Sequence, residues 1–129
     1  MHVASGAAVG AAAGSRSRAF LLGLASHALG DAVPHEDFES RRFEIGSGLA
    51  LFALLAVRLG PFHPAVIGAA AASAPDLEHV LPLPRPGGLQ LFPSHRVEGW
   101  HRSGGVSAPL QLLAAGVIVG GLAFRREES

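Results

Sequence analysis

Residues 19–37 read AFLLGLASHALGDAVPHED, an apolar run followed by a proline and three polar side chains. The apolar run, 19–33, predicts a helix. Pro34 ends this helix, because a proline disfavours helical backbone in the residue before it. An ionisable side chain next to hydrocarbon is costly, so His27 and Asp31 inside the apolar run indicate a functional site.

The chain contains four more apolar stretches, at 3–14, 45–59, 64–81 and 106–124, and each predicts a helix. The 129 residues are 49% hydrophobic and only 16% charged, against about 25% in ordinary soluble domains. Only 106–124 easily reaches the roughly 20 helical residues that cross a bilayer core. We therefore expect an all-α protein, a polytopic membrane helix bundle of about five short transmembrane or re-entrant helices. Residues 1–129 would form a single membrane-embedded domain of a multi-pass protein of the cell membrane.

Composition excludes several classes of function. The chain has no cysteine, which excludes disulfides, thiolate metal sites and cysteine nucleophiles. Its net charge is zero and it has no basic stripe, so we expect no nucleic-acid partner and take the lipid bilayer as the first partner. Glycines recur at every fourth position, a spacing that lets helices pack closely, so an oligomer is possible through these stripes. The repeating glycines are Gly6, Gly10 and Gly14, and Gly116 and Gly120.

Alternating the five predicted helices between two sides brings most of the chemically capable side chains together. The amino terminus, the connector 34–44 and the loop 82–105 would share one side. Imidazoles and carboxylates from distant parts of a chain that meet in this way are typical of a metal site. The candidate ligands are His2, His27, Asp31, His35, Asp37, Asp76, Glu78, His79, His95 and His101.

The most informative pair is His27 and Asp31, four residues apart. Residues at this spacing share one face of a helix, so both side chains can bind one cation. The alternative is structural: Asp31 would then only orient His27, or pair with Arg41 or Arg42.

A second group follows Pro75. Asp76 and His79 are three residues apart and share a helical face, while Glu78 points elsewhere unless the helix is broken. The alternative for Asp76 is a helix cap, because aspartate is favoured at helix starts.

A third group lies in the loop before the last apolar stretch. Here Arg96 and Arg102 are candidates to bind a phosphate or a carboxylate of a substrate. Loop histidines beside arginines are also often simply solvated. Mixed imidazole and carboxylate ligands suit a divalent metal, with zinc first and manganese or iron as alternatives, and two ions are possible.

The three groups, in this order, resemble a bacterial and archaeal family of small integral-membrane proteins described as metal-dependent hydrolases. Its members have an early His, then Ser-His-x3-Asp-x2-Pro-His-x-Asp at a helix end, then Pro-Asp-x-Asp/Glu-His, and last a His-Arg-rich stretch. The final element departs here, because His95-Arg96 is followed by Trp100-His101-Arg102-Ser103, which is one residue longer and lacks a Thr. The resemblance implies a metal set of His2, His27, Asp31, His35, Asp37, Asp76, Glu78 and His79.

The resemblance also implies a function. We expect a membrane-bound metal-dependent hydrolase-like protein that acts on a phosphoester or lipid-linked substrate, with a metal-activated water as the nucleophile. The sequence identifies no catalytic residue beyond the ligands. The alternative is a non-enzymatic membrane protein in which the same residues form a structural metal site or a polar His/Asp cluster. An open coordination position would distinguish a catalytic from a structural metal.

Overall fold

The computed structural model describes residues 1–100 and 102–125. All regular elements of these residues are helical, which confirms the all-α prediction, and His35 makes isolated bridges to Ser103 and Val106. The elements are, in order, α1 (His2–Ala12), α2 (Arg16–Ala32), α3 (Arg41–Leu59), α4 (Pro64–Ser73), α5 (Leu77–Val80), the 3-10 turn η1 (Pro86–Gly88), α6 (Pro93–Arg96) and α7 (Ala108–Ala123).

Local sequence explains where these helices begin and end. The Ser15 hydroxyl accepts a hydrogen bond from the Arg18 backbone N–H and so caps α2. At the start of α4, Nδ1 of His63 accepts from the Ala65 N–H in the same way. The predicted end of α2 is confirmed, because Val33 before Pro34 has extended backbone angles.

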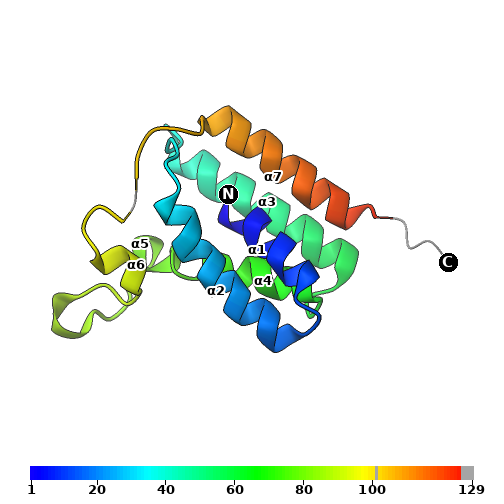
Figure 1. Cartoon of the computed structure of the whole chain (residues 1–129), viewed down its shortest axis with the longest axis horizontal. Coiled ribbons are helices and arrows are strands. Elements are labelled where there is room, and N and C mark those ends of the chain that lie inside the picture. The colour runs from blue at the N-terminus through cyan, green and yellow to red at the C-terminus, as the bar shows by residue number, and fades with distance from the viewer. Residues whose placement is uncertain (101, 126–129) are drawn as a thin grey trace.

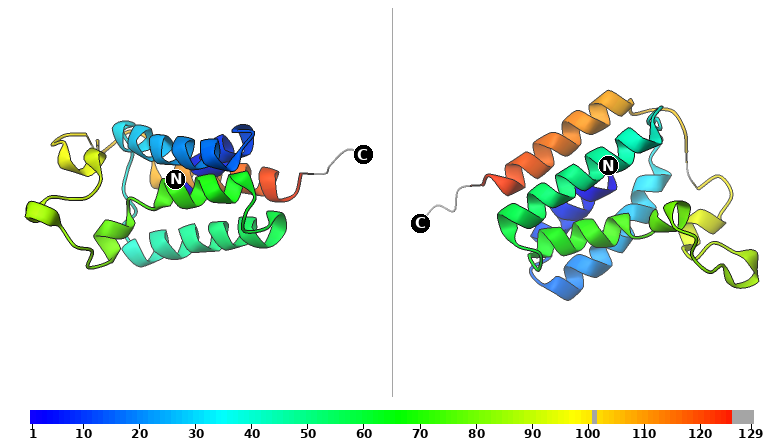
Figure 2. Two further views of the ribbon diagram at one scale, coloured as in Figure 1. Left: turned by 90° about the horizontal axis from the view of Figure 1, so that it is seen from below. Right: turned by 180° about the vertical axis from the view of Figure 1, so that it is seen from behind.

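Helix α4 lies at the centre of the bundle and packs against α1 and α2 on one side, with α3 on its other side (Figure 2). The contact depends on glycine. A Cβ added to Gly68 would overlap the backbone of Gly6 and Gly10 in α1, and one added to Gly23 in α2 would overlap Gly68. The close backbone approach that the glycine spacing predicts is therefore made inside one chain.

The remaining glycines of the predicted stripes behave differently. Gly14 lies beyond the end of α1 with φ of +70°, in the turn to α2, where glycine is favoured. A Cβ at Gly116 or Gly120 of α7 would meet no atom within 4 Å. Self-association through α7 stays a prediction.

The helices alternate in direction, so the amino terminus, the α2–α3 connector and the long segment between α4 and α7 lie at one end of the bundle (Figure 1). This segment includes α5 and α6 and folds over the ends of the helices. The candidate ligands within the described residues, from His2 to His95, lie at this end of the molecule.

The expected multi-pass membrane location is wrong. None of the helices within 1–100 and 102–125 combines the length and the apolar character needed to cross a bilayer. The longest, α3, has 19 residues but starts with Arg41 and Arg42 and carries Arg58 in its last turn. The predicted stretch 64–81 is divided, because α4 ends at Ser73.

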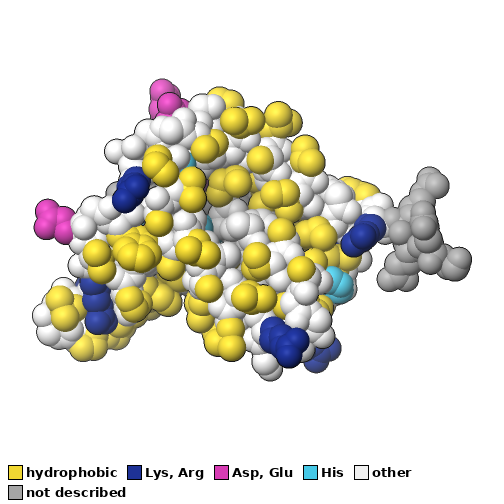
Figure 3. Space-filling model, viewed as in Figure 1, with side chains coloured by type: hydrophobic (Ala, Val, Ile, Leu, Met, Phe, Trp, Pro, Cys, Tyr) yellow, Lys and Arg dark blue, Asp and Glu magenta, His cyan; other side chains and the backbone are white. Residues whose placement is uncertain are grey.

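The distribution of large and small apolar residues explains why hydropathy alone suggested spanning helices. The buried cluster is built mainly of alanine, with Leu55 and Val119 among its few larger members. Many large apolar side chains lie on the surface instead, including Leu21, Val57 and Val117. Figure 3 shows such side chains spread over one face of the molecule, with arginines toward its ends.

Candidate metal centre

The candidate site forms where α1, α2 and α6 meet. Helix α2 presents His27 and Asp31 one turn apart, and both are buried, with 1% and 4% of their surface exposed. His2, the first residue of α1, places Nε2 3.3 Å from Oδ1 of Asp31. His95 arrives from α6 and completes the group from a distant part of the sequence.

Three atoms converge at the centre of this group. Nε2 of His27 lies 3.1 Å from Nε2 of His95 and 3.1 Å from Oδ2 of Asp31. Nε2 of His95 lies 3.7 Å from the same carboxylate oxygen.

The other nitrogen of each ring already has an acceptor. Nδ1 of His27 donates to the Ala72 carbonyl oxygen at 2.9 Å, and Nδ1 of His95 donates to Oε1 of Glu78. In the neutral imidazoles, both Nε2 atoms are therefore left with lone pairs. Two nitrogen lone pairs and a carboxylate oxygen thus point into the same space.

A cation explains this arrangement better than a shared proton. One proton can bridge the two imidazoles, but Oδ2 of Asp31 is buried and makes no hydrogen bond. Tetrahedral zinc, with bonds of about 2.0–2.1 Å, separates its ligand atoms by about 3.3–3.4 Å. The observed separations of 3.1, 3.1 and 3.7 Å span this value. The three side chains therefore fit a metal ion.

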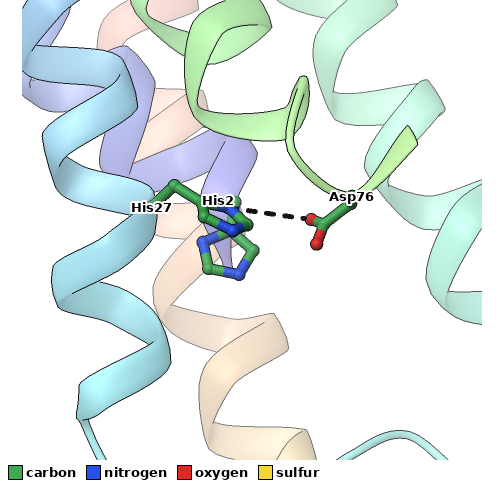
Figure 4. Close-up of side chains that lie close together, drawn as sticks. All are labelled: His2, His27 and Asp76. Atoms are coloured by element: carbon green, nitrogen blue, oxygen red, sulfur yellow. Dashed lines mark ion pairs between the residues drawn. The ribbon is translucent and has the colours of Figure 1, made fainter. Parts of the chain in front are cut away.

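A second group shares His27. His2, His27 and Asp76 offer ligand atoms within 4.8 Å of one another (Figure 4). Asp76 Oδ2 lies 4.0 Å from Nδ1 of His27, the nitrogen already bonded to the Ala72 carbonyl. This group would have to break that hydrogen bond if it used the same nitrogen, so we regard the set of His27, Asp31 and His95 as the principal centre.

Glu78, His79 and His95 form the third group. Glu78 is 2% exposed and accepts hydrogen bonds from His95 Nδ1 and, at 2.6 Å, from the Leu91 N–H. A metal-binding histidine commonly donates its second N–H to a carboxylate, which fixes the ring orientation. Glu78, predicted as a ligand, is therefore placed to orient His95. The ring of His79 is tilted against the ring of His95, and the two ring centroids lie 4.4 Å apart.

Electrostatics favours ionised carboxylates in the cluster. Burial opposes the charged form of Asp31, but the imidazoles of His2 and His27 outweigh it and hold the pKa of this carboxyl far below its usual range. Burial likewise opposes ionisation of Glu78, yet the hydrogen bonds from His95 and Leu91 lower its pKa. Two buried carboxylates beside several imidazoles make a site that attracts a cation.

The pKa values of His27 and His79 are shifted in opposite directions. Burial opposes the charged form of His27, but the negative charges of the nearby Asp31 and Asp76 outweigh it and raise the pKa of His27. Burial and the nearby His95 lower the pKa of His79. A proton therefore competes with a metal for the imidazole of His27.

Several predicted site residues lie outside the three groups found within 1–100 and 102–125. His35 donates from Nδ1 to the Val33 carbonyl oxygen at 2.7 Å, and both His35 and Asp37 line a cavity next to the cluster. The Arg96 side chain donates to two backbone carbonyls of its own loop. Arg102 is exposed, and its backbone N–H donates to the backbone carbonyl oxygen of Asp31. His101 lies outside the described residues.

For one residue near the site, nothing in the sequence predicts its position there. Arg41, considered only as a partner of Asp31, donates to the His79 carbonyl oxygen and lines the same cavity. It joins the first turn of α3 to α5. Only the tertiary fold brings these two elements together.

Searches of family models, curated proteins and solved structures found no match to this chain. The family resemblance therefore stands on the motifs alone.

Proposed function

We propose that this protein is a metal-dependent hydrolase that binds one zinc ion between His27, Asp31 and His95 and acts on phosphoesters. The observation that carries the proposal is the convergence of three potential ligand atoms around one point, including a carboxylate oxygen that makes no hydrogen bond. Zinc is bound by two histidines and a carboxylate in some hydrolases, and iron and manganese are alternatives for the same donors.

The surroundings of the three ligands favour a catalytic over a structural metal. Structural zinc sites have four protein ligands, whereas catalytic sites have three and leave one position open. Asp31 and His95 both line a cavity of about 890 Å³, so a fourth position on that side is accessible to water and substrate. His79 and Asp76 line the same cavity and are available to exchange protons there.

A zinc ion bound here would supply a Lewis acid and lower the pKa of a water toward 7. In the hydrolysis, a water oxygen bonds to phosphorus, the ester P–O bond breaks, and the leaving alkoxide takes up a proton. Glu78 holds His95 in position, and Ala72 does the same for His27 through its carbonyl oxygen. Both hydrogen bonds keep Nε2 directed at the centre.

The motif resemblance agrees with this class of reaction, because its His-x3-Asp and Pro-Asp-x-Glu-His elements are the segments that meet at the cluster. A second candidate function is a structural metal site or polar cluster. It is favoured by the burial of His27 and Asp31 beneath the helix ends.

Metal analysis and hydrolysis together test the proposal. Purified full-length chain would be loaded with zinc, desalted and analysed by mass spectrometry for metal content, and then assayed with bis(4-nitrophenyl) phosphate. Asp31→Asn and His95→Ala remove principal ligands. His63→Asn is the matched control, because His63 caps α4 at the other end of the bundle and asparagine is also a good cap.

We expect zinc and hydrolysis in the wild type and in His63→Asn, and neither in the ligand variants. Zinc without hydrolysis would favour the structural alternative. Absence of zinc from the wild type would contradict the proposed hydrolase and a structural metal site, and would favour the polar cluster.

A further inference from the structure

The cavity beside the cluster has two chemically distinct walls. Its volume, about 890 Å³, is within the roughly 300–1,000 Å³ range of small-molecule sites. One wall carries the polar groups His2, Asp31, Asp76, His79 and His95. The other, from α3 and α7, is mostly apolar and includes Ile45, Leu49, Phe52, Leu112 and Ala115, with Ser47 and Gln111 among its polar members.

Helix α3 connects the two walls along one face. Arg41, Ile45, Gly48, Leu49 and Phe52 all line the cavity, with the spacing of a continuous helical stripe. The stripe starts at the guanidinium beside α5 and continues with apolar residues, while Glu44 and Ser47 of the same helix also line the cavity. From Ile45 to Phe52 it spans about 10 Å, the length of a chain of about eight carbons.

We propose that the cavity binds a single-chain alkyl phosphoester, with its phosphate at the metal centre and Arg41 and its chain along α3. This inference rests on the proposed function and specifies its substrate class. A sugar or a nucleoside would leave hydroxyl groups without partners against Ile45, Leu49 and Phe52, which is costly. An alkyl chain has no such groups.

Because of the charges that line the cavity, binding of the phosphate group should depend on the metal. Asp37 and Glu44 also line it and repel an anion, so Arg41 alone does not make this end positive. A bound divalent ion adds the missing positive charge. The head group should therefore need zinc, whereas the contribution of each methylene should not.

Two glycines of α3 provide a matched test. A Cβ on Gly48 would point toward Val3 Cγ2 of α1, 3.9 Å away, so Gly48→Leu fills the apolar part of the cavity. Gly46 does not line the cavity, and a Cβ there would meet no atom within 4 Å. Leucine is the better helix former, so neither variant should impair folding of α3.

The probes are ethyl-, butyl-, hexyl- and octylphosphonate, which cannot be hydrolysed as esters, used below their critical micelle concentrations. Their affinity for the full chain would be measured by calorimetry, with and without zinc. Because the readout is the gain in affinity with chain length, the test does not require turnover. Failure of the proposed function would appear separately, as missing zinc or missing hydrolysis.

We expect affinity to rise about two- to fourfold per methylene in the wild type and in Gly46→Leu, as expected when methylenes leave water. In Gly48→Leu, octylphosphonate should bind no better than ethylphosphonate, whose affinity should change less than twofold. Equal affinity for ethyl- and octylphosphonate in the wild type would overturn the proposal. So would an undiminished chain-length effect in Gly48→Leu.

Discussion

Nε2 of His27 and Nε2 of His95 face each other at 3.1 Å, although these residues are 68 positions apart in the sequence. The Nδ1 atoms of both rings donate hydrogen bonds away from the contact. Oδ2 of Asp31 lies beside the pair, 3.1 Å from the first nitrogen and 3.7 Å from the second. These three atoms are placed to act as ligands of one ion.

Glu78→Gln should weaken zinc binding about 10- to 100-fold, the usual effect of losing a hydrogen-bond partner of a metal ligand. Both carboxylate oxygens of Glu78 accept hydrogen bonds, and an amide can replace only one of them. Competition with a chromogenic chelator measures the affinity. Glu98→Gln, an exposed residue of the neighbouring loop, is the control and should bind zinc normally. Equal affinity in both variants would exclude an orienting role for Glu78.

Zinc affinity should fall as the pH falls through the raised pKa of His27, by about tenfold per pH unit for each proton that the metal displaces. The sign follows because only the neutral imidazole binds metal. Asp76→Asn removes one of the charges that raise this pKa, so the decline should begin at a lower pH than in the wild type. Calorimetry in buffers of different ionisation enthalpy counts the released protons. An affinity constant from pH 5.5 to 8 would contradict the assignment.

Asp31→Asn and Asp37→Asn should have opposite outcomes. Both residues belong to the predicted ligand set, but only Asp31 contributes an atom to the principal centre. We expect Asp31→Asn to lose zinc and Asp37→Asn to retain it, as measured by metal content after desalting. Loss in both variants would mean that the centre extends to the α2–α3 connector.

Gly68→Ala should lower the free energy of unfolding by about 1–3 kcal/mol, the usual cost of overpacking. Its Cβ would overlap backbone atoms of Gly6 and Gly10, which cannot move as a flexible side chain does. Gly116→Ala is the matched control. Its Cβ meets no atom within 4 Å, so improved helix propensity should raise stability by about 0.5–1 kcal/mol. Urea unfolding measures both, and a neutral Gly68→Ala would show that α1 and α4 are packed less closely.

Much of the fold could be predicted from local pattern. The end of α2 before Pro34 follows from proline geometry, and the pairing of His27 with Asp31 follows from helical spacing. Alternating helix directions then brought His2 and His95 to the same end. These features depend on short-range rules that one sequence contains.

The predictions from sequence failed where the position of a residue depends on the tertiary structure. Hydropathy predicted spanning helices because it measures apolar content, but Ser73 ends α4 early and α3 carries charge at both ends. Helical spacing could not assign Glu78, because α5 is a separate short helix that turns this side chain inward to His95. The cavity position of Arg41 likewise depends on how α3 meets α5.

An anomalous difference map at the zinc edge, from crystals of the zinc-loaded full chain, would show directly where the metal binds. We predict one strong peak about 2.0–2.2 Å from Nε2 of His27, Nε2 of His95 and Oδ2 of Asp31, which are normal zinc–ligand distances. A map with no peak among these three atoms, or with its strongest peak at other side chains, would contradict the assignment of the centre.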